Sequence, residues 1–134
     1  MPKVKRKAVP MKDRKLRSGF ERKIRANLEK AKVDYKYESM VIPYTVPESV
    51  HKYIPDFILA NGVIVEAKGL LDRDGRKKLA LVIEQNPDKD IRVLFQRNNR
   101  IAKNSKTTYE MWCKARNIKC AVSPQGLIPE EWLE

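Results

Sequence analysis

Hydrophobic residues recur every three or four positions between Phe20 and Ala31, and the other face of this stretch carries Arg, Lys and Glu. The spacing predicts an amphipathic helix over about residues 19–32. Ser18 stands where an N-cap is expected and Glu21 follows three residues later, which is the arrangement of a capping box. Glu21 therefore has a purely structural interpretation before any other is considered.

A shorter period follows this helix. Tyr35, Tyr37 and Val41 alternate with charged residues in a β-prone run, which predicts a first strand over about residues 35–42. Residues 43–50 contain two prolines and show no helical pattern. We expect them to form a stiff, extended spacer between two halves of the chain.

The most apolar part of the chain consists of two short runs around the turn signal Asn61-Gly62. Residues 56–59 and 63–68 flank this signal and predict a β-hairpin. Both runs are apolar on both faces, which is typical of central strands that are covered on each side of a sheet. Packing alone does not explain polar side chains at the ends of such strands, because burying a polar group without a partner costs free energy.

The length of the hairpin loop decides which residues face each other. A two-residue loop would set Asp56 opposite Ala67, on the wrong face of the hairpin. A three-residue loop that ends at Gly62, as a bulge residue, sets Asp56 opposite Glu66. Glu66 and Lys68 are two apart in a strand and share a face. We predict the three-residue loop, which aligns all three side chains.

The remaining elements alternate between helix and strand. In order they are a helix capped by Asp72 or Asp74 that ends before Pro87, a buried strand over residues 91–95, a helix from the capping box Thr107 and Glu110 to about Arg116, and a short strand over residues 118–122. With the first helix and the three strands before them, the order is αβββαβαβ. This order predicts an α/β fold with a mixed central sheet flanked by helices.

Charge indicates the kind of partner. The chain of 134 residues carries 29 Lys and Arg against 17 Asp and Glu, a formal net charge of +12. Basic residues gather in residues 3–17 and 92–119, which indicates a folded unit that binds phosphates of a nucleic acid at its edges. Residues 1–16 lack an apolar period and are predicted to form a flexible basic arm, with 17–134 as a single domain.

The composition excludes several classes of protein. Cys113 and Cys120 are too few for a secreted disulfide framework and lack the spacing of a zinc site. His51 is the only histidine, which argues against histidine-dependent nucleases and zinc enzymes. The charged N-terminus and the lack of any run near ~18 apolar residues predict neither a secretion signal nor membrane contact. We expect a cytoplasmic protein.

Asp56, Glu66 and Lys68 form the candidate site. Hydrolysis of a phosphodiester needs carboxylates that hold a divalent cation against the phosphate, and a positive group that stabilises charge or orients water. The alternative is structural: Asp56 only starts a strand, and Glu66 and Lys68 form an exposed ion pair of little energetic value. The surrounding Val and Ile favour the functional interpretation, because an unpaired buried charge costs on the order of several kcal/mol.

A series of motifs supports that interpretation. Pro55-Asp56 followed by Glu66-Ala67-Lys68 matches the PD-(D/E)xK signature of the restriction-endonuclease-like nuclease superfamily. Further motifs in the same order are Arg17-Ser18-Gly19-Phe20-Glu21, Ile42-Pro43-Tyr44, Tyr53-Ile54-Pro55-Asp56-Phe57, Arg76-Lys77-Lys78 and Leu127-Ile128-Pro129-Glu130-Glu131-Trp132. The series resembles the phage endonuclease I family of Holliday-junction resolvases over roughly residues 17–132. Residues 97–106 and 123–126 fit the family less well.

The resemblance implies a catalytic set and its metals. It implies that Glu21, Asp56, Glu66 and Lys68 are catalytic, that Asp56, Glu66 and the Ala67 carbonyl hold one metal ion, and that Glu21 helps to hold a second. The expected ion is Mg²⁺, with Mn²⁺ able to substitute, and no small-molecule cofactor is expected. Only the resemblance raises Glu21 above its capping-box interpretation.

The resemblance also implies an intertwined homodimer in which the first helix and strand cross to the other subunit. The swapped segment would be residues 17–42, the spacer 43–50 and the catalytic core 51–134. The proline-bearing spacer suits such an exchange, because a stiff extended link favours reaching over folding back. Each active site would then take Glu21 from one chain and the other catalytic residues from its partner.

The expected function is a structure-selective endonuclease that makes paired symmetric nicks in four-way junctions and other branched DNA, in the host cell cytoplasm if the protein is phage-encoded. Besides the basic arm, the candidate DNA contacts are Arg17, Arg76, Lys77, Lys78, Arg97, Arg100 and Lys103. Two alternatives remain open. One is a sequence-specific, restriction-type endonuclease, and the other is a non-catalytic basic DNA-binding protein.

Overall fold

The structure is a computed structural model that describes residues 19–46 and 49–134. The predicted basic arm, Arg17 and the Ser18 cap lie outside the described residues. The elements, in chain order, are α1 (Gly19–Lys30), β1 (Tyr35–Tyr37), β2 (Ile42–Val46), β3 (Ser49–Tyr53), β4 (Phe57–Leu59), β5 (Ile64–Lys68), α2 (Arg73–Gln85), β6 (Ile91–Phe95), α3 (Tyr109–Ala115), β7 (Cys120–Val122) and a 3-10 helix, η2 (Glu130–Trp132).

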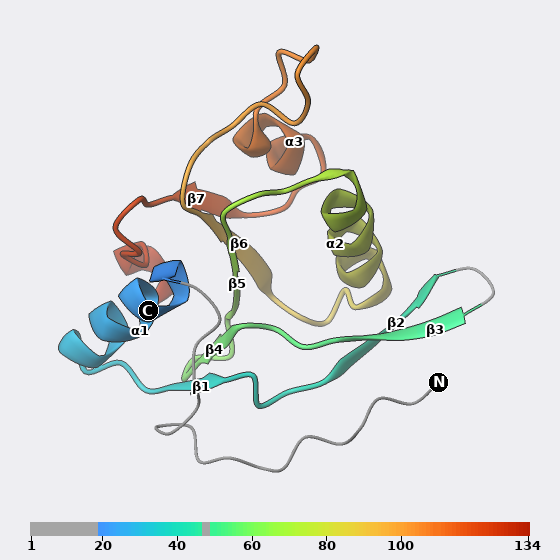
Figure 1. The fold of residues 1–134 in the computed structure, drawn as a ribbon. Coiled ribbons are helices and arrows are strands. Elements are labelled where there is room, and N and C mark those ends of the chain that lie inside the picture. The colour runs from blue at the N-terminus through green and yellow to red at the C-terminus, as the bar shows by residue number, and fades with distance from the viewer. Residues whose placement is uncertain (1–18, 47–48) are drawn as a thin grey trace.

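A five-stranded sheet with the order β1-β4-β5-β6-β7 forms the centre of the fold (Figure 1). The pairs β1–β4 and β4–β5 are antiparallel, whereas β5–β6 and β6–β7 are parallel. The sheet is therefore mixed, and the predicted α/β class with flanking helices is confirmed. Over the described part of the chain, no helix has the length and apolar character needed to cross a membrane.

Alternation along the central strands creates two hydrophobic cores, one on each face of the sheet. Ile64 packs with residues of α2 and α3, and the next residue, Val65, packs with α1 and Trp132 of η2. Figure 1 shows the same division, with α1 and η2 on one side and α2 and α3 on the other. This explains why the central runs are apolar at consecutive positions.

Helix α1 is the predicted amphipathic helix, and it ends at Lys30 rather than near residue 32. Asn27 Nδ2 donates hydrogen bonds to the carbonyls of Gln125 and Gly126, at 3.0 and 2.9 Å. Gly126 has φ +76°, and a Cβ placed there would lie 3.0 Å from the Ile24 nitrogen. The segment before η2 therefore packs closely against the helix that carries Glu21, at a position that favours glycine.

The hairpin register is the one predicted from the three-residue loop. Phe57 pairs with Val65 and Ile58 with Ile64, and Leu59 N donates to the Val63 carbonyl at 2.8 Å. Gly62 has φ +92°, a conformation that side chains disfavour. Continuing the ladder by one position sets Asp56 opposite Glu66, as expected.

The segment after β1 differs from the prediction of one strand over residues 35–42. The first strand stops at Tyr37, because Glu38 takes the left-handed conformation with φ 48° and turns the chain. A second strand, β2, then starts at Ile42 and pairs antiparallel with β3, Val46 facing Ser49. The described residues of the predicted spacer, 43–46 and 49–50, are thus extended, but β2 and β3 pair with each other beside α2, which the prolines did not indicate.

The helix caps follow sequence rules with one correction. Asp72, one of two predicted caps, accepts a hydrogen bond from Gly75 N at the start of α2. The cap of α3 is Thr108, which accepts from Met111 N, so the predicted capping box of Thr107 and Glu110 is wrong. Glu110 pairs instead with the side chain of Asn98. The preceding loop decides this, because it brings Asn98 to the helix start.

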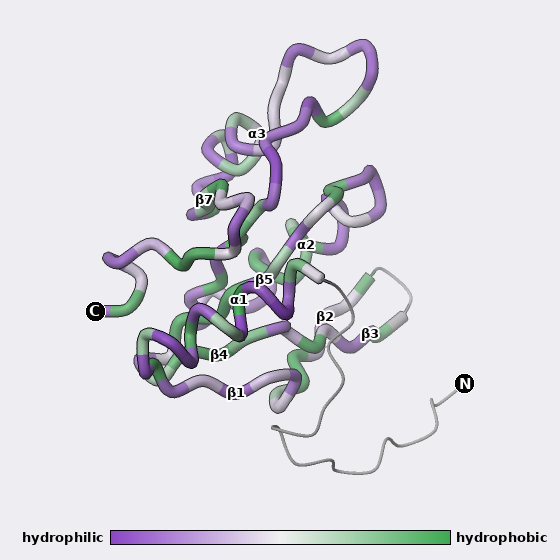
Figure 2. The backbone as a smooth tube through the Cα atoms, turned by 60° about the vertical axis from the view of Figure 1, so that its left-hand side comes forward, coloured by the Kyte–Doolittle hydropathy of each residue, from purple (hydrophilic) through white to green (hydrophobic). Residues whose placement is uncertain are grey.

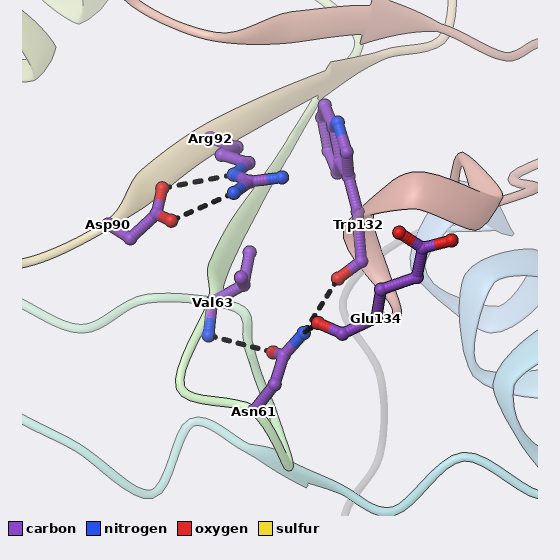
Figure 3. Close-up of polar contacts among 6 residues, drawn as sticks. All are labelled: Asn61, Val63, Asp90, Arg92, Trp132 and Glu134. Atoms are coloured by element: carbon purple, nitrogen blue, oxygen red, sulfur yellow. Dashed lines mark hydrogen bonds and ion pairs between the residues drawn. The ribbon is translucent and has the colours of Figure 1, made fainter.

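The C-terminal segment is hydrogen-bonded to the hairpin loop (Figure 3). Asn61 Nδ2 donates to the carbonyls of Trp132 and Glu134, both at 2.9 Å, and Asn61 Oδ1 accepts from Val63 N at 3.0 Å. The Arg92 guanidinium lies 5.5 Å from the centre of the Trp132 ring. One asparagine therefore joins the loop that sets the β4–β5 register to the segment that covers α1.

Replacing Asn61 with Ala is expected to lower the free energy of unfolding by about 1–3 kcal/mol, because the substitution removes these hydrogen bonds and leaves backbone groups without partners. Urea denaturation measures the change. Asn104→Ala, at an exposed position in the loop before α3, serves as the control and should change little. An Asn61→Ala protein as stable as the native chain would show that the hydrogen bonds of Asn61 do not stabilise the fold.

Candidate active site

Asp56 lies directly before β4 and is 6% exposed. The amide of Ala67 donates a hydrogen bond to Asp56 Oδ2 at 2.9 Å. This bond takes the place of the next rung of the ladder between β4 and β5 and fixes the carboxylate against the adjacent strand. The side chain is therefore held in a buried position by the hairpin that the sequence encodes.

The proline before Asp56 has a specific consequence for the neighbouring strand. The register sets Pro55 opposite Ala67, at a position where two facing residues of an antiparallel pair normally exchange both hydrogen bonds. Pro55 has no N–H, so it cannot donate a hydrogen bond to the Ala67 carbonyl. The Ala67 N–H and carbonyl point to the same side, which directs this oxygen towards the Asp56 carboxylate.

Glu66 and Lys68 lie on β5, beyond the part of the strand that β4 covers. Tyr53, at the end of β3, donates its hydroxyl hydrogen to Glu66 Oε1 at 2.6 Å. Lys68 Nζ lies 3.6 Å from Glu66 Oε2. Glu66 is 9% exposed, so the predicted alternative of an exposed ion pair does not describe this residue.

Glu21 reaches the same place from the other side of the sheet. It lies in the first turn of α1, is 7% exposed and accepts a hydrogen bond from the Tyr37 hydroxyl. One ligand oxygen each of Glu21, Glu38 and Asp56 lie within 4.8 Å of one another. The described chain thus brings its own Glu21 to its own Asp56.

Sequence reasoning did not find Glu38, Tyr37 or Tyr53 as members of the site. Glu38 belongs because the chain turns after β1, where its amide donates to the Asp56 carbonyl at 3.1 Å. The tyrosines resembled ordinary β-strand residues. A signal existed for Tyr53, which stands three residues before Asp56 in one of the motifs that carry the family resemblance, but nothing in the pattern indicated a contact with Glu66.

Burial and mutual repulsion dominate the electrostatics of the site. Burial, followed by the charges of Glu66 and Glu21, raises the pKa of Asp56 to about 8. Burial also raises the pKa of Glu66, although Lys68, the Tyr53 hydroxyl and Lys78 oppose the shift. Lys68 and Lys78 offset only part of the cost of holding these carboxylates together, and a bound divalent cation would offset more of it.

Comparison of the sequence with known proteins identifies the family. A family model for phage endonuclease I matches residues 1–134. The chain belongs to the phage endonuclease I family. It is 43% identical over 119 residues to endonuclease I of Escherichia phage T7, covering 88% of this chain and 78% of that protein. It is 45% identical over 106 residues to endodeoxyribonuclease 1 of Enterobacteria phage T3, covering 78% and 70%. The family resemblance seen in the motifs is confirmed.

The predicted DNA contacts of this phage endonuclease I family member divide into two groups. Most are exposed in the structure: Lys77, Lys78, Arg97, Arg100 and Lys103. Three of these lie in the hydrophilic loop between β6 and α3, which extends from the body of the protein in Figure 2. Arg76 differs, because its Nη1 donates to the carbonyls of Leu71 and Ile101, both at 3.0 Å. Arg76 therefore ties this loop to α2.

The charge of Lys78 acts on Glu66 and opposes the rise in the pKa of that carboxylate. Its Nζ is 5.9 Å from the centre of the Tyr44 ring and 5.8 Å from that of the Tyr53 ring. The His51 ring stacks on the ring of Tyr44, with 5.4 Å between the ring centres. The β2–β3 hairpin and α2 thus form a basic, aromatic border beside the site.

Proposed function

We propose that this protein is a metal-dependent DNA endonuclease that resolves four-way junctions and related branched duplexes by paired, symmetric nicks. The observation that carries the proposal is the group of buried carboxylates beside Lys68, in a chain of the phage endonuclease I family. A non-catalytic DNA-binding protein has no need to bury three acidic side chains together. The high positive charge of the chain supports DNA as the substrate.

The donor atoms fit Mg²⁺, with Mn²⁺ as a substitute, because they are oxygens of carboxylates and a carbonyl. Asp56, Glu66 and the Ala67 carbonyl would hold one ion, and Glu21 with Asp56 a second. Asp56 is repelled by both Glu66 and Glu21, which agrees with its lying between the two positions. Bound ions of this kind activate the attacking water and stabilise the leaving oxygen.

Lys68 acts on the phosphate in this proposal. Its ammonium is held 3.6 Å from Glu66 Oε2, and 29% of its side chain is exposed, so it can contact both the buried carboxylates and a phosphate that approaches from solvent. A positive group at this point stabilises the charge that develops on the phosphate oxygens. Selection of branched DNA would come from the shape of the phosphate backbone, read by the exposed basic residues.

We further propose that two chains exchange the segment of residues 17–42 to form the working homodimer. Only Pro47 and Glu48, which lie outside the described residues, connect the paired residues Val46 and Ser49. Opening such a short connection converts the hairpin into one long link, and a second copy then remakes the contacts of α1 and β1. Val50, 74% exposed on β3, is available for contact with that copy.

The proposal is tested by nicking of an immobile four-way junction beside a linear duplex of matched sequence, with and without Mg²⁺. We expect paired cuts near the branch, only with Mg²⁺ and only in the junction. Lys68→Ala should slow cutting roughly 10²–10³-fold, as does removal of other charge-stabilising donors. Lys89→Ala is the matched control, because Lys89 also pairs with a carboxylate, Asp88 at 3.3 Å, but before β6 and away from the site.

Two results would each favour one of the alternative functions. Tight junction binding without cleavage under any divalent metal would favour the non-catalytic DNA-binding protein. Cutting of the linear duplex at one sequence would favour the restriction-type endonuclease.

A further inference from the structure

Two buried tyrosines each donate a hydrogen bond to a carboxylate of the site. The Tyr53 hydroxyl donates to Glu66 Oε1 at 2.6 Å, and the Tyr37 hydroxyl donates to Glu21 Oε1. The tyrosines come from different strands, β3 and β1, and they pack in different hydrophobic cores. The same type of contact therefore occurs twice, once at each of the two carboxylates whose charges act on Asp56.

The third carboxylate is held in a similar way by a backbone donor. Asp56 Oδ2 accepts from the Ala67 amide. Each of the three acidic side chains thus has one oxygen fixed by a donor of the protein. For Glu66, the geometry also shows what the second oxygen does: Oε2 is directed towards Lys68, 3.6 Å away.

The phenols are suited to this task by their chemistry. A phenol presents one donor on a rigid ring, and a buried ring cannot change its position without disturbing the core. Burial and the nearby carboxylates raise the pKa of both tyrosines above its ordinary value, so each hydroxyl keeps its hydrogen. A fixed donor of this kind restrains the rotation of the carboxylate that it contacts.

We propose that Tyr53 and Tyr37 are positioning residues of the metal site, each holding one oxygen of a carboxylate ligand so that the other oxygen is presented to a divalent cation. The inference rests on the proposed function, in which Glu66 and Glu21 bind the metal ions. It adds two residues that act through these ligands and do not touch the DNA. A merely structural role would be limited to satisfying buried polar atoms.

Substitution by phenylalanine separates these two roles, because it keeps the ring and removes only the hydroxyl. Partners of metal ligands typically contribute 10–100-fold to metal affinity or activity. We expect Tyr53→Phe and Tyr37→Phe each to weaken Mn²⁺ binding, measured by calorimetry in the absence of DNA, by about 10-fold or more. The Mg²⁺ concentration for half-maximal junction cutting should rise by a similar factor, with junction affinity unchanged in metal-free buffer.

Tyr109→Phe is the matched control. Tyr109 and Tyr53 are both 4% exposed and lie in the same core, but Tyr109 is on α3 and packs its ring on Phe95. This substitution should leave Mn²⁺ affinity unchanged.

The outcomes distinguish the inference from the proposed function. If the native chain neither binds Mn²⁺ nor cuts the junction, the proposed function fails. If the native chain does both and the two phenylalanine variants bind Mn²⁺ as tightly, the positioning role is overturned. A lower melting temperature with native Mn²⁺ affinity would also overturn it, since only the structural role would remain.

Discussion

Two inactive variants are expected to regain nicking activity when they are combined in one dimer. In an exchanged dimer, each site takes Glu21 from one chain and Asp56, Glu66 and Lys68 from the other. A chain with Glu21→Gln paired with a chain with Lys68→Ala therefore places both defects in one site and leaves the other site complete. Without exchange, each site keeps one defect and the dimer stays inactive.

The expected gain is large. Each homodimer should cut roughly 10²-fold or more below the native rate, whereas the mixed dimer should recover about half of the native nicking rate. Co-expression with two different tags and successive purification on both isolates the mixed dimer. Restored activity should appear as nicking of single strands, because only one site is complete.

A second combination serves as the control. Asp56→Asn and Lys68→Ala both lie in the core segment, so a mixed dimer of these chains has one defect in each site whether or not the segments are exchanged. It should remain inactive. If the Glu21→Gln and Lys68→Ala pair is equally inactive while the native dimer cuts, the sites are completed within single chains, as in the described structure.

Asp56→Asn is expected to abolish cleavage and yet make the metal-free protein more stable. Burial and the charges of Glu66 and Glu21 raise the pKa of Asp56 from 3.8 to about 8. The folded chain therefore holds a proton on Asp56 that the unfolded chain releases above about pH 4. Stability from this group is present below that pH and is lost as the pH rises to about 8. Asparagine is neutral throughout and can still accept from the Ala67 amide.

Thermal unfolding in EDTA at pH 5 and pH 8 measures this effect. We expect the variant to melt higher than the native chain at pH 8, by roughly 3–5 °C for each kcal/mol gained in a chain of this size, and by less at pH 5. Added Mg²⁺ should narrow the difference, because under the proposed function only the native site would bind the ion tightly and gain stability by mass action. Cleavage should fall roughly 10²–10³-fold or more, as expected when several kcal/mol of metal-based stabilisation are lost.

Asp90→Asn provides a control with the opposite sign. The Arg92 guanidinium lowers the pKa of Asp90, so this carboxylate stabilises the folded chain above about pH 4. Its neutral replacement should lower the melting temperature slightly at pH 8, since the pair is partly exposed. An Asp56→Asn protein that melts below the native chain in EDTA at pH 8 would contradict the electrostatic account.

Local rules were sufficient where neighbours in the chain make the contacts. The hairpin register followed from loop length and strand period, because Asp56 and Glu66 are joined by a single short loop. The helix at residues 19–30 and the strand at residues 91–95 followed from apolar spacing for the same reason. The catalytic assignment of Glu21, by contrast, came from family resemblance, and it remains a prediction until tested.

Contacts between distant segments were beyond such rules. Arg76 looked like a DNA contact, but it binds two backbone carbonyls, one of them in the loop before α3. Glu38 and Tyr37 enter the site only because β1 pairs with β4 and is followed directly by Glu38 in the left-handed conformation. Likewise, the two prolines after residue 42 indicated an extended segment but not the partner that it pairs with.

The sequence by itself determined the α/β class, the order of the main elements, the family, and the placement of Asp56, Glu66 and Lys68 on one hairpin. Periodicity, turn chemistry and motif spacing act over a few residues, and these features depend on nothing longer. The tertiary structure alone decided that Glu21 approaches Asp56, and that Tyr37 and Tyr53 hold the acidic side chains. These contacts join α1, β1, β3 and β5, and they form only when two cores close on opposite faces of one sheet.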